Sequence, residues 1–166
     1  MISRNLVILS LLAFSTSLLG VACGNSEPAC GLSITIEGHN NDGESFFECA
    51  GGQGSGSSLS MGFRDDSSGI SVLIESDGPS RGVVDQDYPA TITVEGPDYE
   101  SKFSCSIHVG ENQDTEAHIN EVTYSISGIG RCGRSVNILA SQEPSPYRVI
   151  GEFSYVSSVD WRSSAW

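Results

Sequence analysis

Short stretches in which apolar and polar residues alternate with a period of two recur along most of the chain. Residues 103–109 show the pattern most clearly, because Phe103, Cys105, Ile107 and Val109 are separated by polar residues. Successive side chains of a strand point to opposite faces, so each stretch predicts a half-buried strand. About nine strands are expected, at residues 32–37, 45–50, 59–63, 70–74, 90–94, 103–109, 122–126, 136–140 and 149–155.

No stretch shows convincing helical periodicity, so the chain is expected to be all-β. Short strands separated by turns favour an antiparallel β-sandwich, jelly-roll-like, and a closed β-barrel is the alternative. Between strands, the composition indicates a glycine-rich loop at residues 51–57, a polar loop at 110–116 and a glycine turn at 128–133.

The first 22 residues have the composition of a signal peptide. Residues 1–5 are polar and carry one cation, Arg4, and residues 6–19 are apolar and uncharged. This apolar run is within the about 7–15 residues of a secretory h-region and shorter than the about 18–20 that span a bilayer. Small residues follow at Gly20 and Ala22. We therefore expect export and removal of residues 1–22.

Residues 19–23, Leu-Gly-Val-Ala-Cys, resemble the lipobox of bacterial lipoprotein precursors. The resemblance covers only this leader, and it implies cleavage before Cys23 and acylation of that cysteine. More than one acyl chain anchors a protein stably. Gly24 is not the aspartate that retains such proteins at the inner membrane, which implies the cell envelope at the outer membrane. The alternative is ordinary cleavage after Ala22, which leaves Cys23 as a thiol.

An odd number of cysteines fits this interpretation. If Cys23 is acylated, four of the five cysteines remain for two disulfides, which export to an oxidising compartment favours. Three pairings are open. Cys30 with Cys49 and Cys105 with Cys132 are preferred, because each pair could join neighbouring strands.

The exported part is the right size for one domain and is strongly acidic. It has 144 residues, with a flexible spacer after Cys23 at residues 24–29, a β domain at 30–160 and a polar tail at 161–166. Its 21 acidic and seven basic residues give a side-chain charge of −14. Such a surface repels phosphate backbones, so nucleic-acid binding is not expected. The membrane is reached through acylated Cys23.

Few residues indicate catalysis. Residues 128–133 spell G-x-G-x-x-G, but a dinucleotide site needs a helix after the glycines and a strand pattern follows here. The histidines are His39, His108 and His118, and no serine lies in a nucleophile motif. Convergence of a histidine and a carboxylate in one pocket would favour an enzyme.

Acidic loops make calcium a weak candidate ligand, because hard cations prefer carboxylate and carbonyl oxygens. The same loops also serve to keep an exported protein soluble. Zinc between His108 and His118 is a second, weaker hypothesis, and no other cofactor is expected. The calcium candidates are Asp65, Asp66, Asp85 and Asp87, together with residues 111–116.

Several aromatic residues are predicted in or near loops and the tail, where they could form a platform for a glycan. They are Tyr88, Tyr99, Tyr147, Trp161 and Trp166. We expect a lipid-anchored cell-envelope protein whose β domain is non-catalytic and binds a protein or glycan partner at the cell surface or has a structural role. The alternative is a small exported hydrolase, metal-dependent or not.

Overall fold

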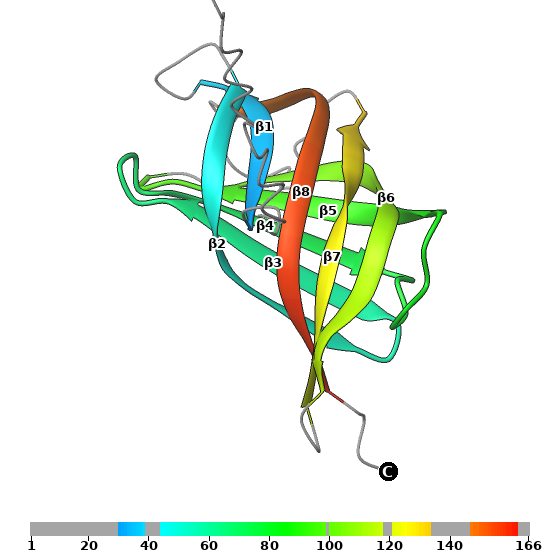
Figure 1. Ribbon diagram of the computed structural model, residues 1–166. Coiled ribbons are helices and arrows are strands. Elements are labelled where there is room, and N and C mark those ends of the chain that lie inside the picture. Colours follow the sequence, from blue (N-terminus) through cyan, green and yellow to red (C-terminus); the bar gives the residue numbers. More distant parts are fainter. Residues whose placement is uncertain (1–29, 39–43, 99, 118–120, 134–146, 163–166) are drawn as a thin grey trace, which may run out of the picture.

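The structure, a computed structural model, describes residues 30–38, 44–98, 100–117, 121–133 and 147–162. It contains eight strands there, and each pairs antiparallel with the next along the chain (Figure 1). β8 also pairs antiparallel with β1, which closes the sheet into a barrel. The strands are β1 (Gly31–Glu37), β2 (Glu44–Ser55), β3 (Ser58–Asp65), β4 (Ile70–Asp77), β5 (Gln86–Glu95), β6 (Glu100–Ala117), β7 (Glu121–Cys132) and β8 (Arg148–Arg162).

The all-β prediction is confirmed, and the architecture is the closed barrel rather than the sandwich that the sequence favoured. A sandwich needs two sheets, whereas here β8 returns to β1 and all eight strands share one sheet. Eight of the predicted strands coincide with β1–β8, and the strand expected at residues 136–140 lies outside the described residues. Among the described residues, none belongs to a helix long and apolar enough to cross a membrane.

Several strands are longer than their alternating patterns suggest. Most of the glycine-rich stretch 51–57 belongs to β2, the polar stretch 110–116 belongs to β6, and residues 128–132 belong to β7. The predicted loops and turn at these places are therefore wrong. The tail prediction also fails at its start, because β8 continues to Arg162 and buries Trp161.

Large side chains of β8 fill the barrel opposite glycines of the neighbouring strands. Phe153, Tyr155 and Trp161 are all buried. A Cβ atom at Gly130 of β7 would lie 2.0 Å from the Phe153 ring, and one at Gly54 of β2 would lie 2.2 Å from the Trp161 ring. Glycine occupies these two strand positions because any larger residue would clash with the aromatic rings.

The glycines of β2 also complete the closure of the barrel. β1 begins at Gly31, opposite Glu48, so it covers only the first part of β2. Beyond that point β2 and β8 pair directly and in parallel, at Gln53–Ser55 and Asp160–Arg162. A Cβ atom at Gly52 would lie 2.7 Å from the Ser158 carbonyl oxygen, so this approach requires glycine.

Two disulfides, Cys30–Cys49 and Cys105–Cys132, join neighbouring parts of the wall and confirm the preferred pairing. The first ties the residue before β1 to β2, and the second links directly paired positions of β6 and β7. With sequence separations of 19 and 27 residues, loop-closure entropy gives each bridge about 3 kcal/mol of stabilisation.

The packing of β8 against glycine is tested with Gly130→Ala. We expect the free energy of unfolding to fall by about 1–3 kcal/mol, the usual cost of overpacking a core. The measurement is urea unfolding followed by circular dichroism. Gly62→Ala is the matched control, because Gly62 is also inside a strand but the nearest atom to its Cβ would be 3.6 Å away. Equal losses in the two variants would contradict the packing described here.

Candidate functional site

Side chains of the described residues occupy the barrel interior, so a site is expected on the outer wall. The largest fully buried side chains include Tyr155, Phe47, Phe63, Phe103 and Phe153. The described residues line hollows that are open to solvent in two regions of the wall. One lies over β2–β5 and reaches Ser104 of β6 and Ser158 and Asp160 of β8, and the other lies over β5–β7.

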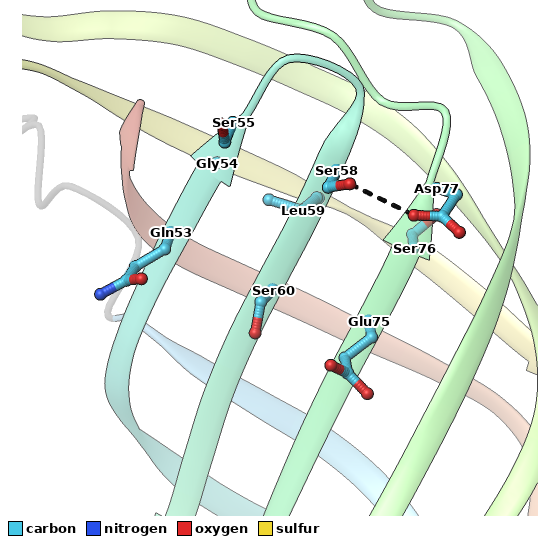
Figure 2. Close-up of a pocket in the computed structure, with 9 residues that line it drawn as sticks. All are labelled: Gln53, Gly54, Ser55, Ser58, Leu59, Ser60, Glu75, Ser76 and Asp77. Atoms are coloured by element: carbon cyan, nitrogen blue, oxygen red, sulfur yellow. Dashed lines mark hydrogen bonds between the residues drawn. The ribbon is translucent and has the colours of Figure 1, made fainter. Parts of the chain in front are cut away.

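The region over β2–β5 is a face of short polar side chains. Gln53, Ser60 and Glu75 are directly paired positions of β2, β3 and β4, and Figure 2 shows them on adjacent strands. The Ser58 hydroxyl donates a hydrogen bond to the Asp77 carboxylate at 3.3 Å. Among the described residues, no aromatic ring lines the hollow of about 460 Å³ there. We interpret this face as a solvated wall.

The second region, which we call the His108 pocket, has a volume of about 520 Å³ and combines charged and apolar groups. Cross-strand pairing places Asp87 beside His108 and His108 beside Ile129. His108 Nδ1 lies 2.9 Å from Asp87 Oδ1. The pocket is lined by Asp87, Ser106, His108, Ile129, Gly130 and Arg131.

Ile129 is an exposed apolar side chain between two pairs of polar side chains. Its exposed fraction is 40%, which is unusual for a large apolar residue of this protein. On one side is the His108–Asp87 pair, and on the other Arg131 Nη2 lies 2.6 Å from Glu152 Oε2. An apolar centre with a charged rim is the common arrangement of a protein contact surface.

A buried tyrosine of β8 is hydrogen-bonded to the backbone of the pocket residue His108. The Tyr155 hydroxyl donates a hydrogen bond to the His108 carbonyl oxygen at 3.1 Å. Burial raises the pKa of Tyr155 well above its usual value, so the hydroxyl keeps its proton and remains a donor. The Cys105–Cys132 disulfide joins β6, which carries His108, to β7, which carries Ile129. The backbone under the pocket is therefore fixed from inside the barrel and along its wall.

Two of the calcium candidates serve the β3–β4 turn. One oxygen of the Asp65 carboxylate accepts hydrogen bonds from the Ser67 amide at 2.9 Å and from the Ser67 hydroxyl at 2.6 Å. Asp66 forms an exposed ion pair with Arg64 at 3.1 Å. These contacts give both carboxylates a local role in the turn.

The other two candidates lie at the start of β5. The Asp85 amide donates to the Val109 carbonyl oxygen at 2.7 Å, and Asp87 pairs with His108. Asp65 pairs with Ile70, the first residue of β4, whereas the start of β5 lies next to the end of β4. The pair Asp65 and Asp66 and the pair Asp85 and Asp87 are therefore at opposite ends of β4. In the described ranges no three His, Cys, Asp or Glu side chains form a group that could hold a metal ion.

The structure separates the histidines and aromatic residues that the sequence singled out. His108 lies in the pocket, whereas His39 and His118 lie outside the described residues, so zinc between His108 and His118 stays a prediction. Tyr147 and Trp161 are buried, so their placement in an exposed platform is wrong.

Tyr88 is half-buried and packs closely on Gly78, which leaves little of the expected platform among the described residues. Tyr99 and Trp166 lie outside them. Sequence reasoning also missed Ile129, Arg131 and Glu152. Only strand register brings them beside His108.

Neither a family model nor a curated protein nor a solved structure matches this chain.

The buried state of Tyr155 makes stability depend on alkaline pH. Above about pH 10 the unfolded chain loses its tyrosine protons, whereas folded Tyr155 keeps its proton because its pKa is raised. The folded state then binds more protons, so the stabilisation present below pH 10 is lost as pH rises further.

We expect the free energy of unfolding to fall more steeply between pH 9.5 and 11 in the wild type than in Tyr155→Phe. The difference between the two slopes should correspond to the release of about one proton on unfolding. Urea unfolding across this range measures both slopes, and the other four tyrosines contribute to both proteins alike. Identical slopes would show that Tyr155 ionises in the folded protein as it does in the unfolded chain.

Proposed function

We propose that this chain is an exported, lipid-anchored cell-envelope protein whose barrel is a non-catalytic binding module. The observation that carries the proposal is the filled interior combined with a mixed apolar and charged pocket on the outer wall. Among the described residues, large side chains occupy the barrel interior, which favours the outer surface as the place for binding.

The chemistry of the His108 pocket favours a protein partner over a glycan. Ile129 offers an apolar contact that a partner side chain could cover, and the His108–Asp87 and Arg131–Glu152 pairs around it can exchange hydrogen bonds with a polar rim. The residues that line the pocket include no aromatic ring on which a sugar could stack. The partner would be a protein of the same envelope compartment.

The anchor is supported by the leader and by the cysteines. Cys23 ends the stretch that resembles a lipobox, and the other four cysteines are paired in two disulfides. Disulfides persist in oxidising compartments such as the bacterial periplasm and the cell surface. The strongly acidic composition gives the chain no basic patch for membrane binding, so acylated Cys23 is the proposed attachment.

The His108–Asp87 pair is the observation that favours the second candidate, a small exported hydrolase. A carboxylate on Nδ1 orients a histidine that acts as general base. However, the Asp87 side chain is 79% exposed, and in the described part of the chain no hydroxyl is hydrogen-bonded to the His108 ring. An activated nucleophile requires such a contact. We therefore place the hydrolase second.

Binding through the His108 pocket is tested by photo-crosslinking in the cells that make the protein. A photoreactive phenylalanine derivative replaces Ile129 in one variant and the exposed Glu75 of β4, on the solvated wall, in the control. We expect a discrete protein adduct from position 129, none from position 75, and at least fivefold less adduct when Arg131→Glu is added. Mass spectrometry identifies the adduct.

Equal adducts from the two positions, or no adduct from position 129, would contradict partner binding at this pocket. Ester or peptide hydrolysis that disappears in His108→Ala would instead support the second candidate.

A further inference from the structure

The anchor segment joins the barrel in the middle of its wall. Cys30 immediately precedes β1, whose first residue, Gly31, pairs with Glu48 of β2 and Val156 of β8. Both partners are interior positions of their strands, and the Cys30–Cys49 disulfide fixes the junction to β2. The chain that leads to Cys23 therefore starts from the wall formed by β2, β1 and β8, which lie side by side in Figure 1.

Chain length keeps this wall close to the proposed lipid anchor. Seven residue steps separate Cys23 from Cys30. Whatever their conformation, they span at most about 25 Å, which is less than the diameter of a small domain. A short tether also gives the wall a millimolar effective concentration at the lipid surface, so a weak contact is enough to populate a docked state.

Exposed apolar side chains lie on both sides of β1. Phe46 of β2 is 57% exposed and is paired with Ser33, and Ile150 of β8 is 41% exposed and is paired with Thr35. The Phe46 ring covers Gly31, where a Cβ atom would come within 2.1 Å of it. Phe46 therefore lies directly beside the residue at which the anchor segment joins the barrel.

We propose that the wall of β2, β1 and β8 rests on the lipid surface that holds acylated Cys23, with Phe46 and Ile150 in contact with the lipid. This inference rests on the proposed anchor. A tethered wall needs only a weak contact, which a small apolar patch can supply.

The charge of the protein determines whether the wall binds an anionic or a zwitterionic lipid surface. The exported part carries a net charge of −14, and the exposed Glu44 and Glu48 flank Phe46. Attraction is therefore apolar rather than electrostatic, and an anionic surface opposes it. A zwitterionic surface is the expected support.

The docked wall borders the His108 pocket at Glu152 of β8, which pairs with Arg131, and it leaves the part of the pocket on β5 and β6 accessible. His108 lies on β6, three strands from β1, and Val84 precedes β5, which lies four strands from β1 in the eight-strand barrel. A partner can then reach the pocket from the side that faces away from the lipid.

The test uses the full acylated protein in phosphatidylcholine vesicles with or without brominated acyl chains, which quench tryptophan fluorescence on contact. Phe46→Trp reports the proposed wall, Val84→Trp is the matched control, and the wild type gives the background of Trp161 and Trp166. We expect bromine to quench the added emission of Phe46→Trp at least twofold and that of Val84→Trp not at all. Adding 30% phosphatidylglycerol should reduce the quenching.

Flotation of the vesicles separates failure of this inference from failure of the anchor. Protein that floats while Phe46→Trp stays unquenched would overturn the docked wall and leave the anchor standing. A blue-shifted but unquenched emission would overturn it too, because it places a second copy or another protein on the wall. Native protein that floats no better than Cys23→Ser would overturn the anchor and this inference with it.

Discussion

The packing of β8 against glycines is the interaction on which the rest of the structure depends. Phe153 and Trp161 face Gly130 and Gly54, on the strands to either side. This match of large and small residues lets β8 approach β7 and β2 while filling the interior. The strand that closes the sheet, β8, therefore also supplies much of the core.

Because side chains fill the interior, binding is proposed at the outer wall. The register of the strands determines which side chains lie next to one another there. Asp87, His108 and Ile129 come from β5, β6 and β7 and share one row of cross-strand pairs. Tyr155 links this row to the core through the His108 carbonyl oxygen. The proposed partner site on β5–β7 and the proposed lipid-facing wall of β2, β1 and β8 are neighbouring sectors of the same barrel, joined by the Arg131–Glu152 pair, which suits a tethered protein that presents a binding surface.

The alternating pattern was sufficient to predict the strands and their inward residues, including Phe103 and Ile107, and to choose the disulfide pairing. It could not distinguish a sandwich from a barrel, because both bury alternate residues. Glycine was misread at residues 51–55 and 128–130, since a strand that faces an aromatic ring has the same composition as a loop. The pair of Arg131 and Glu152, 21 residues apart, could not be foreseen because it depends on register.

The environment of Trp161 tests the closed and filled barrel most directly. It is measured by NMR, through nuclear Overhauser contacts and amide exchange in the intact protein. A barrel closed by β8 predicts contacts between the Trp161 ring and the Gly54 Hα atoms, with slowly exchanging amides in the paired segments Gln53–Ser55 and Asp160–Arg162. A Trp161 ring without contacts to β2, with rapid exchange after residue 157, would contradict it, leaving the interior open at the place where β8 is said to fill it.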